Sequence, residues 1–199
     1  MKIDKTKLKI IEKPESLHHE QIKVLLNKAH DSNPDVEYST SDLKEEEVKE
    51  KLKLGGAVFV ALYENVLVGT LTINIESKKQ WYARGKTSCC RFLGVLPEYG
   101  RNGIAFKLLE AVISWAEKNK VDTIIWSPAS NNYASIALAE KHGFHKTDFY
   151  KLKELNHTTV RLVKYLSSDG VSAFRCLCNF YLRKADYIIG KIKYKIKHR

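Results

Sequence analysis

Residues 92–109 hold the pattern in this chain that most directly suggests chemistry. An apolar run over 92–96 stops at Pro97 and is typical of a buried strand. A short polar turn follows, and apolar residues then recur at helical spacing from Ile104 onward. The first backbone N–H groups of such a helix have no partner within it and lie at the positive end of the helix dipole. These donors suit a phosphate or pyrophosphate group, so the pattern indicates a nucleotide-like ligand.

Three residues make this turn suitable for an anion. Gly103 lets a ligand approach the backbone closely, Ala105 keeps the next contact small, and Arg101 adds a cation. The turn has neither the Gly-Lys-Ser/Thr ending of a P-loop nor the three glycines of a dinucleotide-binding turn. Taken alone, a glycine at a loop–helix junction is more often ordinary turn chemistry, so the interpretation needs a second motif.

A second motif lies further along the chain. It consists of Asn132, Ser135-Ile136 and the run Glu140-Lys141-His142-Gly143-Phe144. On the simplest alternative, Asn132 is an ordinary helix N-cap and Gly143 ends the same helix before a core aromatic residue.

The two motifs together resemble those of the GNAT acetyltransferase superfamily. The strand, the Pro-Glu-Tyr run and residues 100–105 are similar to its motif A, and the second motif is similar to the helix after its fifth strand. The resemblance covers roughly residues 7–165.

This resemblance implies an acetyl-CoA site and direct attack of an acceptor amine on the thioester. Pantetheine would pair with the backbone of residues 93–95, pyrophosphate would lie on the amides of residues 101–105, and Asn132 would reach the cofactor. The implied cofactor-binding residues are Leu93, Gly94, Val95, Arg101, Asn102, Gly103, Ile104, Ala105, Phe106 and Asn132.

The chain departs from the family pattern at three positions. Gly100 stands where the phosphate turn usually begins with Gln or Arg, although the backbone donors remain and Arg101 is adjacent. Ala139 aligns with the frequent Tyr general acid, and Cys89 lies near the strand position that carries a Glu base in some members. No matching acid or base is therefore apparent.

Other residues are candidate substitutes for the missing acid and base. They are Glu76, Asp148 and Tyr150, and a water held by backbone carbonyls is a further candidate. Tyr133 is the other nearby phenol. A noncatalytic module that binds acyl-CoA, with a membrane- or partner-binding basic tail, is the alternative to an enzyme.

The elements predicted from the pattern fit an α/β (α+β) domain. Residues 1–166 would form the acetyl-CoA-binding domain, with a GNAT-like mixed, mostly antiparallel sheet flanked by helices. The predicted strands cover 8–11, 57–63, 66–75, 87–96, 121–127, 145–152 and 158–165, and the predicted helices cover 20–29, 43–52, 104–119 and 132–142. Glu64-Asn65 is a plausible hairpin turn between two of the strands.

Composition excludes several other classes of protein. The four cysteines, Cys89-Cys90 and Cys176-x-Cys178, have no zinc-site spacing and suit no disulfide framework, so free and mostly buried thiols in a reducing cytosol are expected. The seven histidines show no ligand spacing, so no metal is expected. We find neither a signal-peptide pattern nor an apolar run long enough to span a bilayer. A cytoplasmic location follows as the expectation.

The C-terminal segment, 167–199, is predicted to be a basic amphipathic extension. Residues 171–199 contain eight Lys or Arg and one Asp, and so hold seven of the chain's eleven net positive charges. This helix could pack on the domain or on a second copy in a homodimer, or it could contact an anionic membrane from the cytoplasmic side. Nucleic-acid binding is the least favoured, because basic residues alone supply nonspecific attraction to phosphate.

The sequence therefore predicts an N-acetyltransferase that moves an acetyl group from acetyl-CoA to a primary amine in a ternary complex. The acceptor is a small molecule, for example an amino sugar, or a protein. Fold alone does not identify it.

Overall fold

The computed structural model describes residues 2–31, 46, 50, 54–77, 82–151 and 158–166. The basic extension over 167–199, with Cys176 and Cys178, lies outside the described residues. So does the helix predicted over 43–52, except for Glu46 and Glu50, which are both helical.

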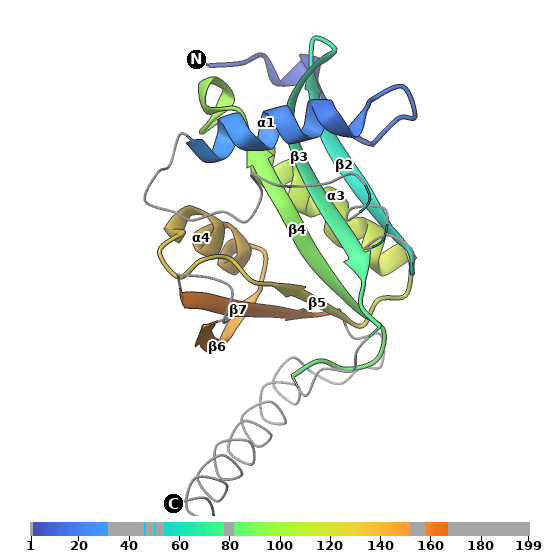
Figure 1. Cartoon of the computed structure of the whole chain (residues 1–199), viewed down its shortest axis with the longest axis vertical. Helices are drawn as coiled ribbons and strands as arrows, with labels where there is room; N and C mark the ends of the chain where they lie inside the picture. The colour runs from blue at the N-terminus through green and yellow to red at the C-terminus, as the bar shows by residue number, and fades with distance from the viewer. Residues whose placement is uncertain are drawn as a thin grey trace, which may run out of the picture.

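A seven-stranded sheet forms the centre of the domain, in the order β1-β2-β3-β4-β5-β7-β6 (Figure 1). The strands are β1 Leu8–Glu12, β2 Gly56–Tyr63, β3 Val66–Ile75, β4 Thr87–Val95, β5 Thr123–Trp126, β6 His145–Lys151 and β7 Thr158–Tyr165. Each pair of neighbours is antiparallel except β4 and β5, which are parallel. The predicted mixed, mostly antiparallel sheet is confirmed.

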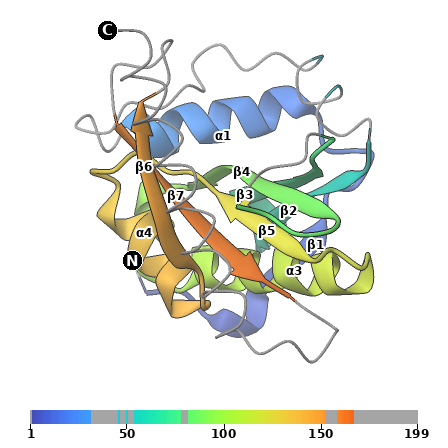
Figure 2. The same ribbon diagram turned by 90° about the horizontal axis from the view of Figure 1, so that it is seen from below.

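Helices cover both faces of the sheet (Figure 2). They are α1 His19–Asp31, α3 Ile104–Lys118 and α4 Tyr133–Lys141, with short 3₁₀ helices at Lys5–Lys7 and Pro97–Tyr99. The predicted helices and strands within the described residues agree with these bounds to within about two residues, the usual uncertainty of such boundaries. Glu64 and Asn65 both have positive φ, at 49° and 65°, as the predicted hairpin turn requires.

The apolar periodicity of each helix decides which sheet face it covers. The stripe of α3, which includes Ile104, Leu108 and Val112, is fully buried against the face that carries Leu71 and Ile73. The shorter stripe of α1, Ile22, Leu25 and Leu26, packs on the opposite face against Val58 and Val60. Because successive strand residues point to opposite faces, Asn74, Arg91 and Arg161 project on the same side of the sheet as α1.

Strands β4 and β5 diverge partway along their length (Figure 1). They pair only from Thr87 with Thr123 to Cys90 with Trp126. Beyond Cys90, β4 continues alone with β3, its register shifts, and Phe92 has a positive φ of 56°. The sheet therefore has an opening beside residues 91–95. Along this stretch, the backbone groups of β4 on the side of β5 do not pair with β5.

The two described cysteines, Cys89 and Cys90, are free and buried, as predicted. Burial raises the pKa of the Cys90 thiol well above its usual value, which keeps this thiol protonated. Across the described ranges no group of His, Cys, Asp and Glu side chains could hold a metal ion. None of the described helices is both long enough and apolar enough to cross a membrane.

Candidate functional site

A groove of about 440 Å³ lies at the opening of the sheet, between the start of α3 and helix α4. It is lined by Leu93, Val95, Tyr99, Gly100, Arg101, Gly103, Ile104, Ala105, Phe106, Ala134, Ser135, Ala137, Leu138 and Lys141. The structure thus brings the strand end, the phosphate-like turn and the second motif to one surface.

The turn at the start of α3 presents its backbone to this groove. Arg101 and Gly103 both have positive φ, 61° and 79°, and Gly103 is the N-cap without any side-chain hydrogen bond to the helix. A Cβ added at Gly103 would meet nothing within 4 Å. The first N–H groups of α3 therefore point into open space, next to the cation of Arg101.

Asn102 supports the turn from behind. Its side-chain nitrogen donates to the carbonyls of Tyr99 (3.1 Å) and Gly100 (3.0 Å), and its oxygen accepts from the Ile3 backbone N–H (3.3 Å). The amide side chain is thus occupied within the protein. Asn102 holds the turn in shape and presents only its backbone as a donor.

Asn132 and Gly94 also have structural roles. The side chain of Asn132, a residue that is only 7% exposed, accepts from the Ser135 N–H (3.1 Å) and caps α4. Neither Asn132 nor Gly94 lines the groove. A Cβ at Gly94 would lie 2.8 Å from the Leu26 side chain, so glycine here allows α1 to pack closely on β4.

The outer end of the groove combines an aromatic ring with cations. The Phe106 ring is packed at 4.2 Å, centroid to centroid, against the His142 ring. His142 is fixed by a bond between its Nδ1 and the Leu138 carbonyl (2.9 Å). Lys141 lines this end, and Arg101 lines the turn. A groove with both cations suits a ligand that carries several phosphate charges.

The sheet face on the α1 side carries a polar network around Arg91. Its Nε donates to Asn74 Oδ1 (2.9 Å) and its Nη2 to Glu76 Oε1 (2.8 Å), while Asn74 Nδ2 donates to the same Glu76 oxygen (3.0 Å). The neighbouring Cys89, and then the bond to Glu76, raise the pKa of the Arg91 guanidinium. The three side chains border an open pocket of about 330 Å³ with Glu50, Leu54, Ile75 and Ser77.

A second network on this face is centred on Arg161. Its guanidinium carbon lies 3.9 Å from the ring centroid of Tyr82 and 4.3 Å from that of Tyr150, and its Nη1 is 3.2 Å from Asp148 Oδ2. The Arg161 side chain is only 12% exposed. Tyr165 donates from its hydroxyl to the Tyr82 carbonyl (2.9 Å), which fixes the loop before β4.

These two networks bring together all three acid and base candidates predicted from sequence. Glu76, Asp148 and Tyr150 lie on one face of the sheet, on β3's end and on β6, whereas Tyr133 is 76% exposed at the start of α4. Ala139 is completely buried in the core, so no acid stands at the family's usual position.

The sequence analysis missed the two arginines that organise this face. Arg91 is the single charge in β4, and Arg161 lies between the apolar residues Val160 and Leu162 of β7, which is a sign of an unusual inward or interfacial position. It also missed His30, in the last turn of α1, whose Nε2 lies 3.3 Å from the Leu93 carbonyl. Burial lowers the pKa of His30.

Comparison with known proteins agrees with the fold. The family model described as the acetyltransferase (GNAT) family matches residues 22–144. An N-alpha-acetyltransferase of Saccharolobus solfataricus is 35% identical over 125 residues, which are 60% of this chain and 67% of that protein.

Solved structures show the same fold at low identity. The structure of an acetyltransferase from Acinetobacter baylyi has a TM-score of 0.64 at 19% identity and covers 80% of this chain and 93% of its own. A GNAT family acetyltransferase from Elizabethkingia anophelis, solved with acetyl-CoA bound, has a TM-score of 0.57 at 17% identity, with 80% and 99% covered. Ribosomal-protein-alanine N-acetyltransferase from Brucella melitensis has a TM-score of 0.61 at 19% identity, with 79% and 99% covered.

The chain therefore belongs to the GNAT family of acetyltransferases. Both the resemblance and the enzyme class predicted from the two motifs, an N-acetyltransferase, are confirmed.

Proposed function

We propose that this protein transfers the acetyl group of acetyl-CoA directly to a primary amine. The observation that carries the proposal is the uncapped start of α3, where Gly103 and Arg101 open onto the 440 Å³ groove beside the gap between β4 and β5. Residues at this turn supply backbone donors for a pyrophosphate, and Lys141 and Arg101 supply charge.

The chain's own residues fit each part of acetyl-CoA. Pantetheine amides pair with the backbone of Leu93, Gly94 and Val95, where β4 has left β5. Pyrophosphate lies on the amides of residues 101–105, and Phe106, 39% exposed, packs against the part beyond it. No side chain intrudes at Gly103, and Asn102 keeps the turn in shape from behind.

The acceptor approaches from the α1 side of the sheet, where the two arginine networks lie. The α-amine of a peptide or protein N-terminus is the acceptor class we propose. Its support is the similarity to an N-alpha-acetyltransferase at 35% identity. An acceptor on the opposite side of the sheet from α3 can reach the thioester while the cofactor occupies its groove, which allows transfer within a ternary complex.

Two measurements test this function. Isothermal titration with acetyl-CoA, CoA and ATP should show micromolar acetyl-CoA binding and much weaker ATP binding. Thiol release should then be followed with short peptides that have a free N-terminus, with the same peptides N-acetylated as the control, and with glucosamine and a nucleotide-linked amino sugar. If only the sugars are acetylated, the acceptor is an amino sugar and not a peptide N-terminus. Tight acetyl-CoA binding without any turnover would favour a noncatalytic module.

The basic extension is proposed to bind an anionic membrane surface. The seven net positive charges over 171–199 support this proposal, since basic amphipathic segments bind anionic lipids. The full chain should co-sediment with phosphatidylserine-containing vesicles, and a chain ending at residue 166 should not. Equal sedimentation of the two would remove the proposal, and a dimer that dissociates on truncation would assign the extension to subunit contact.

A further inference from the structure

We propose that Tyr150 is the residue that gives a proton to the departing CoA sulfur, and that Arg161 positions its ring. This inference rests on the acetyl-CoA-dependent transfer proposed above. It assigns to β6 the function that the family's frequent Tyr performs from the position of Ala139 in this chain.

The strand register places Tyr150 across the opening from the proposed thioester site. Cys90 pairs with Trp126, and Trp126 with Leu162, so these three residues form one row across the sheet. Leu93 lies three residues after Cys90 on β4. Thr159 lies three residues before Leu162 on β7, and it pairs with Tyr150 of β6. Leu93 of β4 and Tyr150 of β6 therefore lie at corresponding levels of the sheet, with β5 and β7 between their strands in the sheet order.

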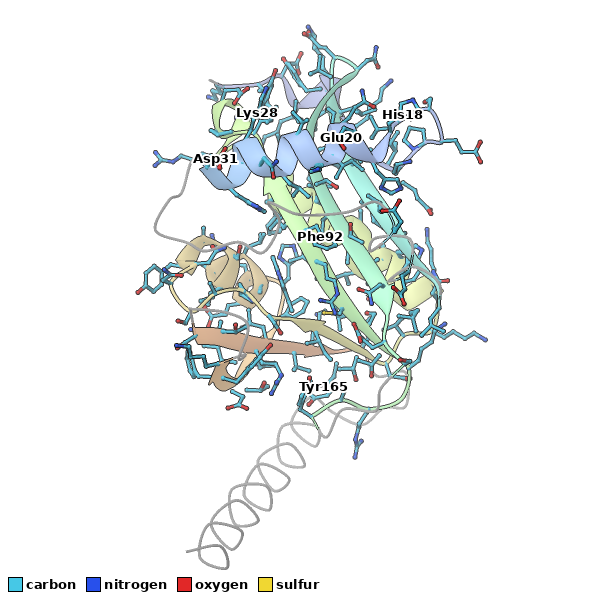
Figure 3. The ribbon with its side chains drawn as sticks, viewed as in Figure 1. His18, Glu20, Lys28, Asp31, Phe92 and Tyr165 are labelled. Carbon is cyan, nitrogen blue, oxygen red and sulfur yellow. The ribbon has the colours of Figure 1, made fainter. Side chains whose placement is uncertain are left out.

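The Tyr150 side chain extends from β6 toward β7, the strand that lies between β6 and β5. Its ring covers the guanidinium of Arg161, on the neighbouring strand, at 4.3 Å. Electrostatic interaction with Tyr150 also contributes to the raised pKa of Arg91, on β4 itself. Figure 3 labels Phe92, near the middle of the sheet below α1, and Tyr165, near the lower edge of the domain in that view.

The other candidates on the face are already engaged. Asp148 is paired with Arg161, and Glu76 accepts bonds from both Arg91 and Asn74. Burial raises the pKa of Tyr82, which opposes its ionisation during a proton transfer. Among the residues that the structure describes, none makes a hydrogen bond with the Tyr150 hydroxyl, so this group is available to a substrate.

Arg161 has the contacts expected of a positioning residue. It is held by the Asp148 carboxylate at one end and by the Tyr82 ring, 3.9 Å away, so its guanidinium has little freedom to move. A fixed cation over the ring also favours the transient negative charge on the Tyr150 oxygen, because the attraction is strong where water is largely excluded.

The proposed step balances protons and electrons. A neutral amine attacks the thioester carbonyl carbon, a C–N bond forms, and the C–S bond breaks with its electron pair leaving on sulfur. Tyr150 gives its hydroxyl proton to that sulfur, and the resulting phenolate takes a proton from the acetylated nitrogen. The products are the amide and CoA thiol, and Tyr150 returns to its starting form.

The first test is Tyr150→Phe, which keeps the ring against Arg161 and removes only the hydroxyl. With acetyl-CoA and a peptide acceptor, kcat should fall by about 100-fold or more, the usual contribution of a general acid or base. The KM for the peptide and the Kd for acetyl-CoA should stay within about twofold, as expected when only transition-state stabilisation is lost. The matched control is Tyr133→Phe, the exposed phenol at the start of α4, which should leave kcat unchanged.

The pH profile separates proton donation from a structural role. The charged or titratable groups that face Tyr150 are Arg161, Asp148, Tyr82 and Arg91. The dependence of kcat on pH should differ between the wild type and Tyr150→Phe, because the variant has no hydroxyl at this position to donate a proton. Arg161→Met should lower kcat, and Arg161→Lys should restore part of it, because Lys keeps the charge without the planar fork.

Two results would overturn the inference while leaving the proposed function intact. One is an unchanged kcat in Tyr150→Phe. The other is loss of acetyl-CoA binding in that variant, which would show that the hydroxyl supports the fold or the groove. A wild-type chain that acetylates no amine would instead refute the proposed function itself.

Discussion

The groove at the start of α3 and the polar face on the α1 side of the sheet are built in different ways. The groove uses backbone and small residues from two short stretches of sequence, centred on Gly103 and on the start of α4. The polar face uses side chains from strands and a loop far apart in the chain, as in the hydrogen bond between Tyr165 and Tyr82, 83 positions apart. A backbone site leaves a compact sequence motif, whereas a side-chain site is assembled only by the fold.

The largest expected effect on ligand binding comes from placing a charge in the groove. Gly103→Glu should weaken acetyl-CoA binding by about 5-fold or more, because like charges at about 4 Å repel by about 1–4 kcal/mol. Isothermal titration would measure it. Gly143→Glu is the matched control, since Gly143 also has a positive φ, 77°, but does not line the groove. Equal affinities in the two variants would show that the turn does not bind phosphate.

A smaller effect is expected where α1 packs on β4. In Gly94→Ala, the new methyl group would lie 2.8 Å from Leu26 and 3.3 Å from Ala29, so the free energy of unfolding should fall by about 1–3 kcal/mol. Urea denaturation would measure the loss. Val24→Ala, at an exposed position of α1, should change stability by less than about 0.5 kcal/mol. A neutral Gly94→Ala would mean that α1 does not depend on this close approach.

Two substitutions of Asn132 can distinguish a role in capping α4 from a role in ligand contact. Asn132→Ala should lower stability by about 1 kcal/mol through loss of the bond to the Ser135 N–H, and should also weaken acetyl-CoA binding. Asn132→Ser should restore the cap and the stability, but not the affinity. If Ser restores both, as measured by denaturation and titration, capping is the whole role of this residue.

The smallest expected effect is the pH dependence of stability due to His30. Burial lowers its pKa in the folded protein, so the unfolded chain binds more protons below the ordinary pKa of about 6.5. The contribution of His30 is therefore fully present above that pH and is lost as pH falls. Denaturation midpoints from pH 7.5 to 5.5 should decline less steeply in His30→Asn than in the wild type, and parallel curves would contradict the assignment.

Much of the fold could be predicted because its signals are local. Apolar periodicity located α1 and α3, and the Glu64-Asn65 pair located a hairpin turn. The pairing limits of β4 and β5 could not be predicted, since the divergence after Cys90 depends on the register of three strands. The hydrogen bond from the Ile3 backbone N–H to the Asn102 side chain could not be predicted either, because it joins positions 99 residues apart.

The sequence by itself determined the family, the sheet-and-helix order and the turn that presents backbone donors at Gly103. These features follow from residue types at short spacing, which act on backbone conformation directly. Only the tertiary structure decided that Arg91 joins Glu76 and that Arg161 lies against Tyr82 and Tyr150. Those contacts depend on strand order and on which face each side chain occupies, and neither is contained in any local stretch of the chain.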